Sequence, residues 1–183
     1  MVFVTLMKLN MSQTFRPARG FTLLELLVAI LIISIVGLYA VEIVASSVTN
    51  FYLDGASYRL LEDLRYARHM ARVNGGWYGV SANVNPTNTY TVYVTDGTTD
   101  TPLANPAAPN QNMIVDLKST YHGVTLSNVS IAGGSKVEFN SSGIPYNDKN
   151  GSALVTNGTI TLSTGTRTRT ITISKNTGTL TQQ

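Results

Sequence analysis

The chain has 183 residues, 43% of them hydrophobic and 13% charged, which suits one modest domain plus an apolar segment. It contains no cysteine, which excludes disulfide frameworks, thiolate metal sites and cysteine nucleophiles. The formal net charge is +3, but three of the 13 Lys and Arg residues precede residue 21, so ten basic and ten acidic residues share the remainder. A globally basic surface of the kind that binds nucleic acid is therefore not indicated.

Residues 21–41 are almost entirely apolar, and Glu25 is the only charged residue among them. About 20 apolar residues suffice for an α-helix to cross a bilayer. Positive charge flanks this run only on its N-terminal side, at Lys8, Arg16 and Arg19. Because positively charged flanks remain in the cytoplasm, we expect the preceding segment to be cytoplasmic and the following one to lie across the membrane.

Three interpretations of the apolar run compete. A cleaved secretory signal has an apolar stretch of about 7–15 residues, shorter than this one, and a plain signal anchor gives Glu25 no role. A carboxylate within hydrocarbon costs on the order of a few kcal/mol, so it is a functional candidate that needs a partner. Cleavage between Gly20 and Phe21 would create an α-amino group, and the amine of a neighbouring, staggered subunit could meet Glu25. The burial cost would then be offset only in the polymer.

Residues 19–29 read RGFTLLELLVA and resemble the class III signal of type IV pilins and pseudopilins, G-F-T-L-x-E. The Gly, Phe, Thr, Leu and Glu of that signal all occur here at its spacing. The resemblance implies that a prepilin peptidase removes a leader, residues 1–20, by cutting after Gly20, and that Phe21 is then N-methylated. It also implies that subunit pairing depends on Glu25.

The helical pattern continues beyond the apolar run, over residues 42–76. Apolar residues recur there at steps of three and four, on one helical face: Leu53, Ala56, Leu60, Leu64, Ala67 and Ala71. Two pairs of opposite charge have helical spacing: Arg59 with Asp63, and Glu62 with Arg65. Residues Asn74-Gly75-Gly76 form a stop signal, since glycine supplies a left-handed C-cap, so one helix of about 54 residues, roughly 80 Å long, is predicted.

Arg65, Arg68 and Arg72 share one face of this helix, with His69 beside them. Such a stripe can dock a partner or bind phosphate. We interpret it instead as the solvated face of an amphipathic helix, since charge runs usually have that role.

After residue 76 the apolar period changes to two, which predicts strands. Strands are expected at residues 77–84, 89–95, 113–117, 123–126, 136–139, 159–163 and 168–174, with Gly- and Asn-containing turns between them. Residues 98–112, rich in Pro, Asn and Ala, are expected to form a loop. The long helix packed on an antiparallel sheet or sandwich over residues 77–183 makes this an α+β fold.

Two further stretches resemble the H-type pseudopilins and the related FimT- and FimU-type minor pilins. Residues 60–71 contain an L-x-x-A-R-x-x-A pattern, and residues 137–180 follow the strand and turn order of their C-terminal module. DNA-binding FimT-type proteins carry a G-R-x-R motif near the last strand, whereas residues 178–181 here read GTLT. Arg167, Arg169 and Lys175 remain as candidates for nucleic-acid contact, and few cations in a neutral domain give it weak support.

No constellation of catalytic residues or metal ligands is indicated. The only histidines, His69 and His122, lie in different segments, so neither a zinc site nor a Ser-His-Asp triad is signalled. Residues 96–100 and 147–150 offer oxygen ligands of the kind calcium uses, but their spacing favours simple turns. We expect no enzyme and no cofactor.

The resemblance implies a minor pilin-like subunit of a type II secretion system or a type IV pilus. It would cross the bacterial inner membrane once, with a cytoplasmic leader and a periplasmic C-terminal domain, and leave the membrane on joining a filament. The implied partners are other pilin or pseudopilin subunits, the prepilin peptidase and the inner-membrane assembly platform. A competence-type minor pilin that binds DNA for uptake, and a minor pilin of an adhesion or motility pilus, are the alternatives.

Overall fold

The computed structural model describes residues 20–84 and 86–183, so the leader's charges at Lys8, Arg16 and Arg19 lie outside the described residues. The chain divides into two compact units, Met1–Glu42 and Ile43–Gln183, and one helix contributes to both. The elements are α1 (Leu23–Asn74), β1 (Trp77–Asn83), β2 (Thr89–Thr95), β3 (Asp100–Pro102), β4 (Ala104–Asn105), β5 (Ala108–Asn112), β6 (Ile114–Asp116), α2 (Leu117–Thr120), β7 (Thr125–Ser130), β8 (Lys136–Phe139), β9 (Pro145–Tyr146), β10 (Gly158–Ser163), β11 (Thr168–Ile173) and β12 (Leu180–Gln182).

Helix α1 begins and ends where local chemistry satisfies its free backbone groups. At its start, the Thr22 hydroxyl accepts a hydrogen bond from the Glu25 amide at 3.2 Å, the interaction of an N-cap residue. At its end, Gly75 has a φ of 67°, the left-handed conformation that glycine adopts without steric cost. The predicted stop after Asn74 is therefore confirmed.

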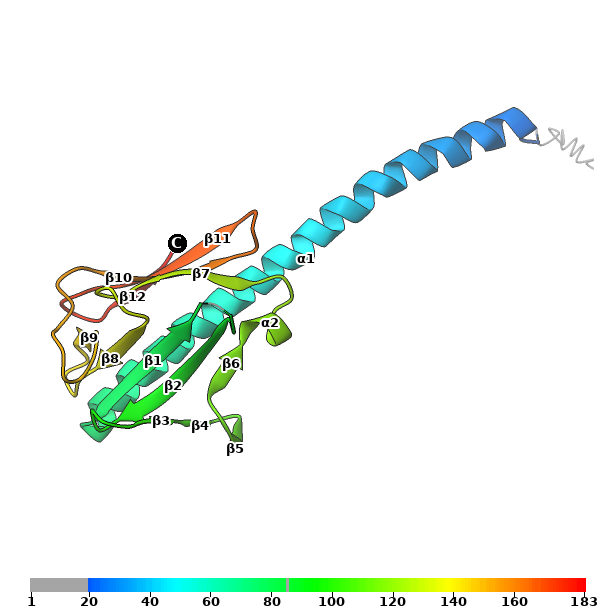
Figure 1. The fold of residues 1–183 in the computed structure, drawn as a ribbon. Helices are drawn as coiled ribbons and strands as arrows, with labels where there is room; N and C mark the ends of the chain where they lie inside the picture. The colour runs from blue at the N-terminus through cyan, green and yellow to red at the C-terminus, as the bar shows by residue number, and fades with distance from the viewer. Residues whose placement is uncertain (1–19, 85) are drawn as a thin grey trace, which may run out of the picture. The chain divides into compact units, whose positions relative to one another are not determined.

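The second unit is an antiparallel α+β domain, as the sequence predicts. One sheet has the order β3-β2-β1-β8-β9, with β6 also pairing with β2, and a second has the order β12-β11-β10-β7. Figure 1 shows β1 and β2 lying along the C-terminal part of α1. Both sheets and the predicted face of α1 contribute to one buried cluster, which includes Leu60, Leu64, Val80, Phe139, Ile160 and Ile171.

The expectation of a loop over residues 98–112 is wrong. The segment forms β3, which pairs with the edge of β2, and the short hairpin β4–β5. After β3, the Leu103 amide also bonds to β2, donating a hydrogen bond to the Val92 carbonyl at 2.9 Å. Backbone groups at the edge of β2 need partners, and this segment supplies them. Its side chains are mostly exposed, so the apolar alternation that identifies a strand is missing.

Polar side chains on α1 connect it to the sheets. Asp63, only 8% exposed, accepts a hydrogen bond from the Tyr90 hydroxyl at 2.6 Å and lies 3.8 Å from Arg59, the predicted partner. Burial raises the pKa of the Asp63 carboxyl, although the Tyr90 hydrogen bond and the Arg59 charge oppose this. The other predicted pair, Glu62 with Arg65, is also present, at 2.5 Å.

Asp63 should make part of the domain's stability depend on pH. Its folded-state pKa lies above the ordinary value of 3.8, so the folded state holds the proton more tightly than the unfolded state. That stabilisation is complete below the ordinary pKa and is lost as the pH rises through the folded-state pKa. The variant Asp63→Asn keeps an oxygen for Tyr90 but cannot titrate. In urea unfolding at a series of pH values, the free energy of unfolding of the wild type should fall relative to Asp63→Asn above about pH 4. A difference that is constant or rises with pH would contradict this assignment.

Candidate functional site

The N-terminal segment carries the predicted processing site. Gly20 is exposed, and Phe21 is 81% exposed, immediately before the Thr22 cap. Helix α1 starts at Leu23, so the Gly20–Phe21 bond lies in non-helical chain. A bond outside regular structure, with no side chain on one flank, is open to a peptidase.

Glu25 lies in the first turn of α1. Its backbone amide is held by Thr22, and a carboxylate near a helix N-terminus is favoured by the helix dipole. No cation pairs with the Glu25 carboxylate anywhere in the described ranges 20–84 and 86–183. Within these described ranges, the Glu25 charge is therefore left without a cationic partner.

The spacing of Thr22 and Glu25 also fits a helix-capping motif, which we did not predict. Thr-x-x-Glu is the pattern of a capping box, in which a threonine caps the helix and a glutamate occupies its third position. The structure contains the threonine half of that arrangement. The pattern could have been found in the sequence, and it explains why α1 begins two residues after Phe21.

An apolar surface follows the cap. Residues Leu23–Ala40 have a mean hydropathy of 2.6 and none is buried, so by length and composition this part of α1 can cross a membrane. Two hydroxyl-bearing residues, Ser34 and Tyr39, lie within it, and Ser34 donates its hydrogen bond to the Ile30 carbonyl of the preceding turn at 2.8 Å. The Ser34 hydroxyl is thereby satisfied without water, as a lipid environment requires.

The structure does not bring the candidate nucleic-acid residues together. Arg167 and Lys175 are exposed beyond opposite ends of β11, whose six extended residues span roughly 20 Å. Arg169 is ion-paired with Asp54 of α1, Nε to Oδ1 at 2.7 Å, so its charge is already neutralised.

The arginine stripe of α1 differs from the solvated face that we predicted. Arg65 and Arg72 are exposed, but Arg68 is half-buried and donates to the Gly143 carbonyl at 3.2 Å and to the Thr177 carbonyl at 2.7 Å. These acceptors are turns far along the chain, so periodicity within the helix could not have indicated them.

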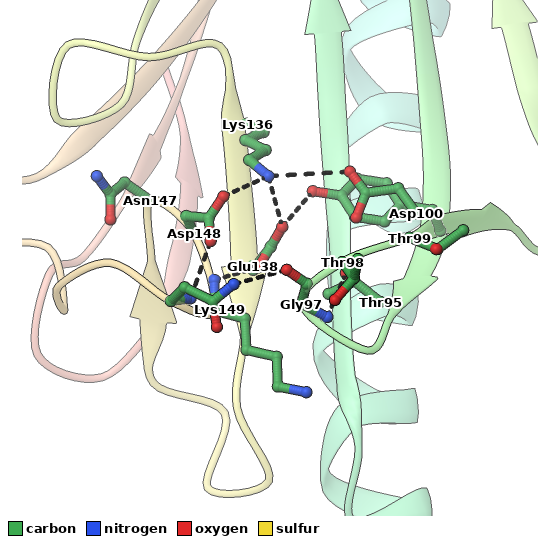
Figure 2. Close-up of polar contacts among 12 residues, drawn as sticks. Thr95, Gly97, Thr98, Thr99, Asp100, Lys136, Glu138, Asn147, Asp148 and Lys149 are labelled. Carbon is green, nitrogen blue, oxygen red and sulfur yellow. Dashed lines mark hydrogen bonds and ion pairs between the residues drawn. The ribbon is translucent and has the colours of Figure 1, made fainter.

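Residues 96–100 and 147–150, the two turns considered as sources of calcium ligands, lie close together, and Lys136 contacts both. Lys136 Nζ is 2.6 Å from the nearest oxygen of Asp148, 3.2 Å from Glu138 and 3.8 Å from Asp100 (Figure 2). Lys149 Nζ also donates to the Asp96 carbonyl. Among the described residues, no group of His, Asp or Glu side chains is arranged to hold a metal ion. The Lys136 ammonium group thus occupies the position between these carboxylates that a calcium ion would need.

Glu138 is the centre of this cluster and is only 1% exposed. It accepts hydrogen bonds from the Tyr93 hydroxyl at 2.8 Å and the Lys149 amide at 2.5 Å. Tyr93 lies on β2, and Gly79 of β1 stands between the two residues in the sheet. A Cβ at Gly79 would lie 3.0 Å from the Tyr93 ring and 2.8 Å from Glu138 Cγ, so only glycine lets the ring reach across β1.

The charged groups around Glu138 stabilise one another in their ionised forms. The Lys136 hydrogen bond is the main cause that lowers the pKa of Asp148, and the carboxylates raise the pKa of Lys136 against the effect of its burial. Sequence reasoning identified the turns but not Lys136 and Glu138. These two residues lie on one face of β8, and their partners come from separate parts of the chain.

Two family models match the chain. Residues 15–41 match the family model of the prokaryotic N-terminal methylation motif, and residues 56–177, two thirds of the chain, match that of type II transport protein GspH. No match was found among the curated proteins.

Solved structures of similar fold are also found. Two are of the minor pseudopilin EpsH from the type 2 secretion system of Vibrio cholerae, each 16% identical over 72% of this chain. They are covered to 95% and 92%, with TM-scores of 0.52 and 0.53. The type IV minor pilin FimU of Pseudomonas aeruginosa is 17% identical over 72% of this chain and 92% of its own, with a TM-score of 0.48, too low to support an argument. At these identities the EpsH structures establish the fold alone.

Removal of the central ammonium should destabilise the β-domain. In Lys136→Met the buried Glu138 loses its cation, and we expect a loss of about 2 kcal/mol in the free energy of unfolding. Lys118→Met is the matched control, because Lys118 is exposed and makes no ion pair among the described residues, so its cost should stay below about 0.5 kcal/mol. Urea unfolding of both variants in the same detergent measures the difference. Equal midpoints would show that the cluster adds no stability.

Proposed function

Because the chain belongs to the family of type II transport protein GspH, we propose that it is a minor pilin-like subunit of a type II secretion system or type IV pilus. Its N-terminal helix would anchor it in the membrane and join it to a filament. The observation that carries this proposal is the union of two features in one chain. A methylation motif starts a helix whose first 18 residues, Leu23–Ala40, are exposed and mostly apolar, and a GspH-like β-domain follows.

The family suggests that other pilin subunits are the partners of the chain. We further propose that a prepilin peptidase and an inner-membrane assembly platform act on it. The leader would lie in the cytoplasm and the β-domain in the periplasm, since positive charge precedes the apolar run and none lies within it. The family and the similar structures are structural subunits, and we propose that this chain likewise has no catalytic role. DNA capture is not favoured, because Arg169 is paired and Arg167 and Lys175 lie apart.

Assembly would use Glu25 in the following way. In the lone subunit the carboxylate has no cationic partner within the described residues, and burying it in lipid is costly. The peptidase would create a new α-amino group at Phe21, one residue before the Thr22 cap. That amine cannot easily turn back to its own Glu25, because the helix begins at once. The amine of a staggered neighbour can approach the carboxylate from outside, so the ion pair forms only between subunits.

Processing is tested by the mass of the mature N-terminus. On coexpression with a prepilin peptidase, we expect a chain that starts at Phe21 and carries one N-methyl group. Gly20→Val should remain uncut, because a branched side chain would occupy the scissile position. Gly37→Ala is the matched glycine control, since a Cβ at Gly37 would meet nothing within 4 Å, and it should be cut normally. A mature start at any residue other than Phe21 would refute the proposed cleavage site.

The pairing role of Glu25 is tested by Glu25→Gln. The variant keeps the backbone that Thr22 caps but loses the charge, so it should insert and fold normally. We expect at least a roughly tenfold loss of incorporation into filaments, which corresponds to the loss of one ion pair in apolar surroundings. Glu62→Gln, an acid farther along the same helix, should assemble like the wild type. The measurement is the subunit content of sheared filaments relative to membranes, with urea unfolding as the check on folding. Normal incorporation of Glu25→Gln would refute the pairing argument.

A further inference from the structure

Four cationic or titratable side chains gather near the C-terminal end of α1. Arg65, Arg68, His69 and Arg72 line a hollow of about 180 Å³, here called the basic pocket. Their spacing of three and four residues places them on one face of the helix. Arg72 lies in the last turn of α1, where a cation is favoured because the helix dipole is negative at that end.

One arginine of the basic pocket is held by contacts outside α1. Arg68 is fixed by the carbonyls of Gly143 and Thr177, which belong to two turns outside α1. Gly143 and Gly178 have φ values of 76° and 64°, and both turns approach the arginines closely. A Cβ at Gly143 would lie 3.0 Å from Arg72 Cδ, and one at Gly178 would lie 3.1 Å from Arg68 Nε. The two turns thus lie against Arg68 and Arg72, and their carbonyls hold Arg68.

The charge of the basic pocket is not balanced. Arg65 is paired with Glu62 at 2.5 Å, and Arg68 binds only neutral carbonyl oxygens. Arg72 makes no ion pair with any residue that the structure describes. Burial, and in second place the charge of Arg72, lower the pKa of Arg68. A negatively charged group in the hollow would relieve this repulsion and give Arg72 a partner.

We propose that the basic pocket binds a carboxylate side chain of an acidic segment on a neighbouring pilin subunit. The identity of that neighbour rests on the proposed function. The planar guanidinium of Arg72 suits a carboxylate, because it can donate two parallel hydrogen bonds. Nucleic acid fits less well, since it gains affinity from several neutralised phosphates, whereas Arg65 is already ion-paired and Arg68 already donates to two carbonyls.

The test uses the full chain in zwitterionic detergent, titrated with a tetraglutamate peptide by calorimetry. The wild type should bind the peptide, and Arg72→Gln should bind it about tenfold more weakly, as expected for the loss of one charge-assisted contact. Arg167→Gln is the matched control, since it removes the same charge from an exposed site outside the pocket, and it should change the affinity less than about twofold. Arg72 is exposed, so its replacement should not impair folding.

Two outcomes would overturn the proposal. One is no binding by the wild type, or equal binding by the wild type and Arg72→Gln. The other is tighter binding of a single-stranded oligonucleotide with the same number of negative charges, which would assign the pocket to nucleic acid. No filament is needed for this measurement. Its failure would leave the proposed function standing, and failure of cleavage before Phe21 would leave this result unaffected.

Discussion

The packing of one face of α1 against both β-sheets is the contact on which the rest of the domain depends. The buried side chains on that face include Leu53, Leu60 and Leu64, and the alanines at 56, 67 and 71 are fully buried among them. Small residues let the strands approach the helix closely, and the leucines fill the space between the alanine positions. The helix and both sheets therefore share one core.

The polar contacts of α1 lie around this apolar face and set how the sheets are placed on it. Asp63 meets Tyr90 of the first sheet, and Asp54 meets Arg169 of the second. Ser57, fully buried, accepts a hydrogen bond from the Gln182 side chain at 2.8 Å. Such bonds contribute about 1 kcal/mol each, far less than the core, but they are directional. They fix positions that apolar packing alone would leave open. Arg68 does the same for the turns at Gly143 and Thr177, and in doing so it shapes the basic pocket.

The two parts of α1 differ in how their apolar side chains are distributed. Its first turns expose leucine, isoleucine and valine in all directions, which is costly in water and natural in lipid or in a bundle of like helices. Its later turns divide into a buried and a solvated face. Glu25 is the exception in the first part, and the cap at Thr22 defines where the helix starts relative to it. Under the proposed function, a neighbouring subunit would supply the opposite charge to this carboxylate, and the pairing would favour the assembled state.

The sequence alone determined what depends on contacts close in the chain. The extent of α1, its stop at Gly75, its buried stripe and its two ion pairs follow from spacing of three or four residues, and the strands at 89–95 and 136–139 follow from alternation. The motif around Gly20, Phe21 and Glu25 is local in the same sense. Only the tertiary structure decided that residues 98–112 form strands and that Lys136 lies among three carboxylates. It also decided that Arg68 is half-buried and donates to carbonyls of two distant turns. In each case the contacting residues belong to separate segments of the chain. Local periodicity cannot indicate such contacts, because they form only when folding brings the segments together around the shared core.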